Sequence, residues 1–86
     1  MRVLNLRPRF HISKERLAPR GTPEHDGVVG VLRDLADERV PLVGSGDHAV
    51  PHGPTLMGRP VLGMGLVVCY IPAGDDVIVV DLLLSR

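Results

Sequence analysis

Two apolar runs near the C-terminal end dominate the hydrophobic pattern of this 86-residue chain. Leu66–Ile71 and Val77–Leu84 are almost continuously apolar and rich in β-branched residues, and the segment 72–76 (Pro-Ala-Gly-Asp-Asp) joins them. A five-residue connection of Pro, Gly and Asp between two such runs predicts a β-hairpin. Because neither run leaves a face for water, we expect both strands to lie centrally in a sheet that is covered on at least one side.

The N-terminal part of the chain predicts a first strand followed by a less regular segment. Arg2–Leu6 alternates apolar and polar positions, and we expect it to form a short strand beside the hairpin. Pro8 ends this strand because proline cannot donate a hydrogen bond to a β-ladder. Further on, Ser13–Ala18 predicts a short helix with Ser13 as its N-cap; the alternative is that 8–21 forms an extended basic arm.

Pro23–Arg39 predicts the clearest helix of the chain. Thr22 is a good N-cap, Pro23 suits the first helical position, and the acidic residues of the first turn favour the helix dipole. Gly27 and Gly30 each weaken the helix by ~1 kcal/mol relative to Ala, so we expect both to permit close packing on the sheet. The face that packs is predicted by apolar residues at helical spacing, namely Val28, Val31, Leu32 and Leu35.

The segment 44–60 is rich in Gly, Pro and His and predicts a long loop of the kind that often carries function. The pattern also allows a short strand at 55–57 or 61–63 that leads into the hairpin. Gly63 and Gly65 then mark a bulge or a sharp bend at its start.

The order of these elements predicts an α+β fold. We expect a single domain over 1–86, in which an antiparallel sheet combines the N-terminal strand with the C-terminal meander. One or two helices pack on one face of this sheet. The basic segment 7–21 and the loop 44–60 are the two parts with a composition of their own.

Composition excludes several classes of site. Phe10 and Tyr70 are the only aromatic residues, so the core must be aliphatic and a stacking platform for single-stranded nucleic acid is not expected. Cys69 is the only cysteine, which excludes an internal disulfide and a cysteine-based zinc site. No leader pattern and no apolar run of about 20 residues is present, so we expect a cytoplasmic protein without a membrane partner or cofactor.

Charge is distributed unevenly although the formal net charge is zero. The segment 1–20 has six basic residues and one acidic residue, whereas 21–86 has four basic and nine acidic residues. A local basic surface of this kind binds phosphates or an acidic partner; the alternative is that the two halves neutralise each other within the fold. The candidate binding residues are Arg7, Arg9, Lys14, Arg16 and Arg20.

Few residues have the character needed for catalysis. His48 and His52 are four apart, but the Pro and Gly residues around them argue against the helix that would align them on a metal, so we expect no metal site. Either they act as acid and base, or they lie on an exposed loop without chemistry. Tyr70 is a core residue or contributes a functional hydroxyl. Asp81 shares a face with Val77, Val79 and Leu83 by strand alternation, so it needs an arginine partner, such as Arg86, or a place at the sheet rim.

The order of elements and the last hairpin resemble the RelE/ParE superfamily of toxins from bacterial toxin–antitoxin modules. In that family an apolar strand ends in Tyr, an Asp-rich turn follows, and a β-rich strand closes on Arg. Here V-V-C-Y-I-P-A-G-D-D-V-I-V-V-D-L-L-L-S-R matches this outline through Tyr70, Asp75-Asp76 and Arg86. The resemblance implies a toxin that is neutralised by an antitoxin laid across its sheet and its basic helical face.

Two positions depart from the pattern of members that cleave RNA. Val67 and Ser85 stand where those members carry Arg and His. The gyrase-inhibiting branch needs no catalytic set, so the resemblance leaves RNA, the ribosome or gyrase as the target. If the chain cleaves RNA, the resemblance implies that phosphate positioning and proton transfer fall to His48, His52, Arg59, Tyr70 and Arg86.

Two other functions fit the same residues. The first is a non-catalytic module that forms a homodimer through the apolar hairpin and binds a ligand or a protein. The second is a small pathway enzyme that uses His48 or His52 as its acid or base. The partner that we expect is therefore an antitoxin protein or a second copy of the chain.

Overall fold

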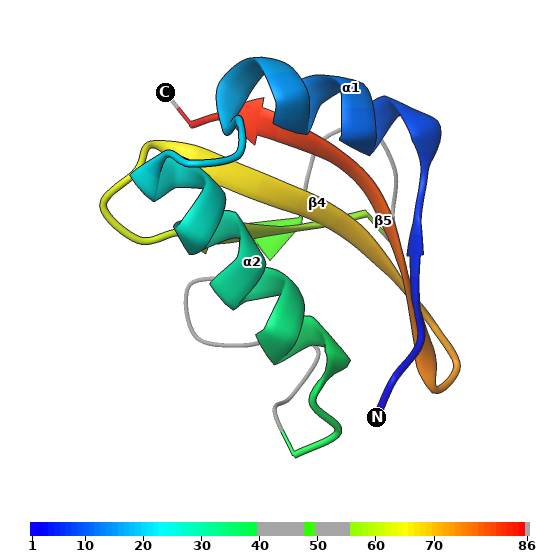
Figure 1. Ribbon diagram of the computed structural model, residues 1–86. Helices are drawn as coiled ribbons and strands as arrows, with labels where there is room; N and C mark the ends of the chain where they lie inside the picture. The colour runs from blue at the N-terminus through cyan, green and yellow to red at the C-terminus, as the bar shows by residue number, and fades with distance from the viewer. Residues whose placement is uncertain (40–47, 50–55, 86) are drawn as a thin grey trace.

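The computed structural model describes residues 1–39, 48–49 and 56–85. Two helices and five strands follow the chain in the order β1 (Leu4–Leu6), α1 (Pro8–Leu17), α2 (Pro23–Ala36), β2 (His48–Ala49), β3 (Met57–Val61), β4 (Leu66–Ala73) and β5 (Asp76–Leu84). Both helices pack against the sheet, α2 across one face and α1 along the far end of β5 (Figure 1). The predicted α+β class is confirmed.

The strands form one mixed sheet in the order β1-β5-β4-β3-β2. The pairs from β2 to β5 are antiparallel, as expected for the meander, but β1 runs parallel to β5 through the pairs Leu4–Val77, Asn5–Ile78 and Leu6–Val79. Parallel strands need a long crossover, and here both helices and three strands lie between the two partners. The N-terminal strand therefore lies beside the hairpin as predicted, but it runs parallel rather than antiparallel and is two residues shorter than expected.

The β4–β5 turn is tighter than the sequence suggested. Ala73 pairs with Asp76, so only Gly74 and Asp75 form the connection, whereas we had expected five residues. Gly74 has a φ of +64°, and no non-glycine residue of the described segments has a positive φ. A positive φ at the first central position alone is the pattern of a type II′ turn, whose twist matches that of the flanking strands. That match lets the ladder continue to the turn.

A β-bulge changes the alternation of β5. Tyr70 pairs with Val79 and Cys69 pairs with Asp81, so Val80 has no direct partner on β4. The extra residue shifts the side chains beyond it by one position. As a result Leu82 enters the core at 1% exposure while Leu83 is 40% exposed, and Asp81 belongs to the row of Cys69. The expected shared face of Asp81 with Val77, Val79 and Leu83 is therefore wrong.

Helix α2 follows the sequence prediction closely at its start. The Thr22 hydroxyl accepts a hydrogen bond from the His25 N–H at 3.2 Å, and Pro23 opens the helix. The helix ends at Ala36, three residues earlier than expected. Asp37 adopts an extended conformation as the C-cap, and its carboxylate accepts hydrogen bonds from the Arg39 backbone and guanidinium. This side-chain interaction with Arg39 lowers the pKa of the Asp37 carboxyl.

Helix α1 begins earlier than its polar sequence suggested. Pro8 occupies the first turn, where a missing N–H costs nothing, so it starts the helix as well as ending the strand. Ser13 was expected to cap the helix, but it lies buried in its middle. The helix ends at Leu17, before Pro19, and the alternative of an extended basic arm is wrong.

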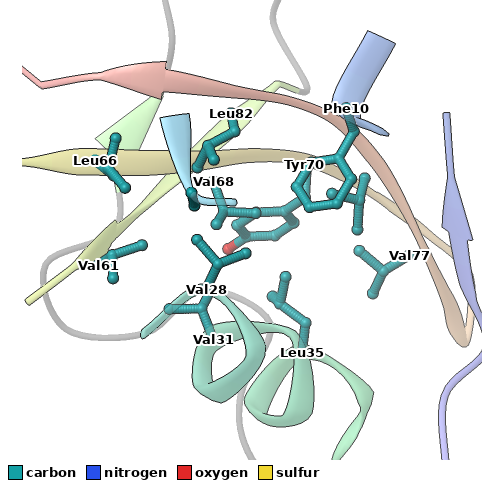
Figure 2. Packing of buried hydrophobic residues seen from close by; sticks show 12 residues of the cluster. Phe10, Val28, Val31, Leu35, Val61, Leu66, Val68, Tyr70, Val77 and Leu82 are labelled. Atoms are coloured by element: carbon teal, nitrogen blue, oxygen red, sulfur yellow. The ribbon is translucent and has the colours of Figure 1, made fainter. Parts of the chain in front are cut away.

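The core lies between the sheet and the two helices and is almost wholly aliphatic. Tyr70 and Phe10 are both fully buried and face each other across its centre, with the valines of α2 beneath them (Figure 2). A smaller cluster of Val67, Cys69 and the half-buried Leu56 occupies the opposite face of the sheet. Both faces of β4 are therefore covered, as its continuous apolar run predicts.

The structure confirms the close packing expected at Gly27 but not that expected at Gly30. A Cβ on Gly27 would lie 2.7 Å from Cγ1 of Val61, so α2 approaches β3 closely at this point as predicted. Gly30 has nothing within 4 Å of such a Cβ, so close packing does not explain it. Gly63 and Gly65 have φ of +77° and +66° in the turn between β3 and β4, which confirms the sharp bend.

The described part of the segment 44–60 lies mostly in strands. His48–Ala49 forms β2, and Met57–Val61 forms β3, which overlaps both places where a further strand was considered. Pairing with β4 therefore outweighs the turn-forming composition of Met57–Val61. A strand can include Pro60 at a position where no backbone N–H is needed for the ladder. The remainder of 44–60 lies outside the described residues.

Candidate functional site

Arg59 and Tyr70 are brought together by the register of β3 and β4. Met57 pairs with Tyr70 and Arg59 with Val68, so these side chains share the helix-covered face of the sheet. The Arg59 guanidinium carbon lies 5.7 Å from the centroid of the Tyr70 ring, within the range of a cation–π interaction. Arg59 is 8% exposed and Tyr70 is fully buried. In this arrangement both side chains pack within the protein rather than on an open surface.

His48 belongs to a different row of cross-strand pairs than Arg59 and Tyr70. It pairs with Gly58, which pairs with Cys69, which in turn pairs with Asp81. Directly paired positions lie on one face of a sheet, and neighbouring positions alternate between faces. The register position of His48 therefore belongs to the row of Cys69, whereas Arg59 and Tyr70 belong to the alternate rows.

Two of the predicted catalytic residues, His52 and Arg86, lie outside the described residues. Their roles, and those of His48, Arg59 and Tyr70, stay predictions. Within residues 1–39, 48–49 and 56–85, no three His, Cys, Asp or Glu residues are grouped closely enough to hold a metal ion. Neither described helix is long and apolar enough to cross a membrane.

Asp81 anchors a buried polar cluster where β5 meets α1. Its Oδ1 accepts hydrogen bonds from the Ser13 hydroxyl at 2.5 Å and from the Leu82 N–H at 2.8 Å. Its Oδ2 lies 3.2 Å from Nε of Arg9, whose side chain is 81% exposed. An arginine partner thus comes from α1. Arg86, the candidate named from the sequence, lies outside the described residues. The bulge at Val80 places the carboxylate beside the helix, a change of alternation that no local sequence signal marks.

Cys69 lies next to this cluster without becoming reactive. The side chain is 2% exposed, and burial raises the pKa of its thiol to about 11, with the Asp81 carboxylate adding to the rise. A raised pKa keeps the thiol protonated at neutral pH, where only a thiolate is a strong nucleophile. The prediction of a small buried hydrophobic residue is confirmed.

The predicted basic residues gather on and beside α1. Arg7 precedes the helix, and Lys14 donates from Nζ to the Ala18 carbonyl oxygen at 3.4 Å. Arg9 and Arg16 lie on one side of the helix, at positions seven apart. Four of the five candidate residues are exposed and Lys14 is half-buried; the exposed four are Arg7, Arg9, Arg16 and Arg20.

Two hollows adjoin along the line where α1 meets β5, and both are lined by Arg9. The first has a volume of about 610 Å³ and lies against Arg7, Ile71, Ile78 and Val80. The second has a volume of about 410 Å³ and is lined by Ile12 and Arg16 of α1 and by the end of β5. Sequence analysis identified the arginines but missed the aliphatic floor, because only the packing of distant segments places Ile71, Ile78 and Val80 beside the start of α1.

Solved structures share this architecture. One chain of the E. coli DinJ–YafQ complex matches with a TM-score of 0.75 and 11% identity, covering 98% of this chain and 93% of that one. A second structure of this toxin–antitoxin complex matches with a TM-score of 0.74 and 10% identity, covering 96% and 91%. This chain has their fold. The fold that the family resemblance implied is therefore confirmed.

Helicobacter pylori provides two further matches. The solution structure of the conserved hypothetical protein HP0894 has a TM-score of 0.63 and 23% identity, with 95% of this chain and 92% of that chain covered. A copper-bound mutant toxin from the same organism has a TM-score of 0.67 and 22% identity, with 98% and 94% covered. A scan against protein-family models and a search of curated proteins found no match. At these identities the likeness is one of fold.

Proposed function

We propose that this chain is a toxin of the toxin–antitoxin type, inhibiting growth until a protein partner binds and neutralises it. The observation that carries the proposal is the match of nearly the whole chain to structures described as toxins or toxin–antitoxin complexes. A second feature supports it independently. The exposed arginines of α1 form a basic surface on a chain with no net charge, which suits an acidic partner.

Controlled expression in a bacterial host tests this proposal. We expect induction of the chain to arrest growth, and co-expression of the small reading frame that adjoins its gene to relieve the arrest. Normal growth at a high level of folded protein would overturn the proposal. Folding is checked by circular dichroism of the same preparation, so that a silent result cannot come from an unfolded chain.

The target of the toxin is either RNA or gyrase, and two assays distinguish these possibilities. RNA cleavage appears as shortened messages in induced cells, whereas gyrase inhibition appears as relaxed plasmid DNA. For the cleaving branch we expect His48→Ala or His52→Ala to abolish the arrest, with the exposed His11→Ala as the matched control. If cleavage persists in both the His48 and the His52 variant, these histidines have no acid–base role.

The buried Tyr70 needs a different substitution. Tyr70→Phe removes the hydroxyl and keeps the ring that fills the core beside Phe10. If the hydroxyl takes part in chemistry, the variant folds but no longer arrests growth. If Tyr70 is a core residue, growth arrest is unchanged.

A homodimeric binding module is the second candidate, and one observation favours it. Ile12, Leu83 and Leu84 are 70%, 40% and 57% exposed and line the same hollow between α1 and β5. Adjacent exposed aliphatic residues are typical of interaction surfaces. A dimeric mass in light scattering, together with normal growth on induction, would favour this candidate over the toxin.

A further inference from the structure

Strand β1 forms one edge of the sheet. The strand order ends at β1, whose neighbour is β5, and no described helix lies on its outer side (Figure 1). The Val77 N–H donates to the Val3 carbonyl oxygen at 3.0 Å. The Arg7 N–H donates to the Val79 carbonyl oxygen, also at 3.0 Å. The main-chain groups of the odd-numbered residues of this segment therefore point toward β5.

Leu4 and Leu6 turn their N–H and C=O groups to the outer edge, because main-chain groups alternate in direction along a strand. Among the described segments, no turn or loop supplies a backbone partner for either residue. Arg2 lies on the same side but differs, since its N–H donates to the Ala36 carbonyl oxygen at 2.7 Å where α2 ends. The donors and acceptors of Leu4 and Leu6 are thus open to another strand.

The side chains around this edge are apolar and incompletely buried. Met1 is 90% exposed and Val3 is 64% exposed. Leu4 and Leu6 are half-buried against the main core. Leu4 also lines a hollow of about 710 Å³ between the N-terminal segment and α2. The apolar residues that line this hollow from α2 are Val29, Leu32 and Ala36. A strand added at the edge would therefore cover apolar surface as well as pair with backbone groups.

The edge is self-complementary about a two-fold axis at Asn5. In an antiparallel pair of two β1 strands centred on this residue, Leu4 of one copy lies opposite Leu6 of the second copy. Because both residues face outward, each such pair exchanges N–H···O=C bonds in both directions. Asn5 is exposed and would lie opposite its own counterpart, as the pair without hydrogen bonds between them.

The charges near the edge favour a second copy as its partner. The chain has no formal net charge, so two copies do not repel each other as a whole. The hollow beside Leu4 is lined by residues of both signs, which are Arg33, Asp37, Glu38 and Arg39. A strongly acidic or basic partner would meet like charges there, whereas a copy of the same surface offers both signs in return.

We propose that two copies of the chain associate through their β1 strands, which pair antiparallel about Asn5 and join the two sheets into one. Such a strand addition gains main-chain hydrogen bonds and brings side chains of the two copies together on each face. The interface is separate from the homodimer considered above, which uses Ile12, Leu83 and Leu84, and it does not depend on the toxin function. Because β1 has only 3 residues, we expect the dimer to be weak and concentration-dependent.

Cysteine crosslinking of the full chain tests the register directly. Opposed residues of an antiparallel pair without hydrogen bonds have Cα atoms about 4.5 Å apart, a separation that a disulfide can bridge. We expect Asn5→Cys to form a covalent dimer under mild oxidation, read on a non-reducing gel. Asp75→Cys, in an exposed turn, controls for random collisions, and Ile12→Cys reports on the other homodimer; both should stay monomeric. The native Cys69 is 2% exposed and does not compete.

A charge at the two-fold axis should weaken the dimer. Asn5→Lys places two like charges directly opposite each other, so we expect the dissociation constant in analytical ultracentrifugation to rise about fivefold or more. Leu62→Lys adds the same charge at an 87% exposed position in the turn between β3 and β4, and should leave the constant unchanged. Circular dichroism confirms that each variant folds. An equal effect of both variants would show that overall charge, not the β1 edge, controls association.

Amide hydrogen exchange reports on the backbone groups themselves. In the wild type we expect exchange at the Leu4 and Leu6 amides to slow as the protein concentration rises, because dimer formation gives these donors a partner. In Asn5→Lys the same amides should exchange quickly over the range of concentrations at which the wild type dimerises. Exchange that is independent of concentration in a dimeric wild type would show that another surface forms the interface.

Three further outcomes would overturn the proposal. The first is a wild-type chain that stays monomeric up to millimolar concentration. The second is a crosslink in Ile12→Cys with none in Asn5→Cys, which would place the dimer at α1 and the end of β5. The third is a monomeric chain whose Leu4 and Leu6 amides are protected only by the product of the adjoining reading frame, which would show that a different protein occupies the edge.

Discussion

The two helices contact the same sheet by different means. Helix α2 buries an apolar stripe of Val28, Val31 and Leu35 and has a side-chain N-cap with acidic residues in its first turn. Helix α1 buries only Phe10 and Ser13, has no side-chain cap and has no acidic residue in its first turn. Apolar area therefore attaches α2, whereas α1 depends on one aromatic ring and on hydrogen bonds to Asp81.

This difference explains why α1 can present a binding surface. Helix α2 directs its buried side chains into the core between itself and the sheet. Because a compact polar cluster attaches α1 beside β5, Arg9, Ile12 and Arg16 remain at the surface. The helix with the weaker intrinsic signals is thus the one that lines the two hollows beside β5. Each prediction below tests part of this contrast.

The largest expected effect concerns the apolar attachment of α2. Leu35 is fully buried, so Leu35→Ala should lower the free energy of unfolding by about 3 kcal/mol through lost burial and a new cavity. The matched change on α1, Ile12→Ala, removes a side chain that is 70% exposed and should change it by no more than about 0.5 kcal/mol. Urea unfolding measures both. Similar values would show that the helices are attached alike.

The polar attachment of α1 is tested at Asp81. Asp81→Ala leaves the buried Ser13 hydroxyl and the Leu82 N–H without their acceptor, so we expect a loss of about 2 kcal/mol. Asp75→Ala, in the exposed β4–β5 turn, is the control and should stay within about 0.5 kcal/mol. Amide hydrogen exchange should also accelerate in α1 more than in α2. Uniform acceleration would contradict a cluster that stabilises α1 specifically.

The packing of α2 is tested at its two internal glycines. Gly27→Ala should destabilise the protein by about 1 kcal/mol, because its Cβ would lie 2.7 Å from Cγ1 of the buried, β-branched Val61. Gly30→Ala meets nothing within 4 Å and should stabilise it by ~0.5–1 kcal/mol through helix propensity. Thermal unfolding gives both signs. A stabilising Gly27→Ala would mean that α2 has room to move away from β3.

The smallest effect is a pH dependence at Cys69. Thiolate forms in the native protein with a pKa of about 11, against an ordinary value of 9.0, so iodoacetamide labelling should rise only in strongly alkaline solution. Removing the negative charge in Asp81→Asn should lower this pKa, since Asp81 adds to the rise. The midpoint of the labelling rate against pH reports the change. A midpoint that does not move would show that burial alone sets it.

Sequence reasoning succeeded where a local signal and burial agree. The N-terminus of α2, the apolar strands of the hairpin and the bend at Gly63 and Gly65 all combine a turn or cap residue with a clear period. The early end of α2 was missed because a side-chain interaction between Asp37 and Arg39 competes with helix continuation.

The candidate site was predicted only in part, for a physical reason. The basic residues of α1 were identified because charge is visible in the sequence. The row that each strand residue occupies was not, because a single extra residue at Val80 reverses the alternation. The separation of His48 from the rows of Arg59 and Tyr70 likewise depends on register, which pairs residues far apart in the chain.

The sequence by itself determined the α+β class, the apolar hairpin, the cap of α2 and the basic character of the N-terminal third. These follow from hydrophobic period, turn residues and charge, which act locally. Only the tertiary structure decided the parallel direction of β1, the early start of α1 at Pro8, the pairing of Asp81 with Ser13 and Arg9, and the apolar floor beside the arginines. Those features arise from contacts between distant segments, whose free energies outweigh the local preferences of the residues involved.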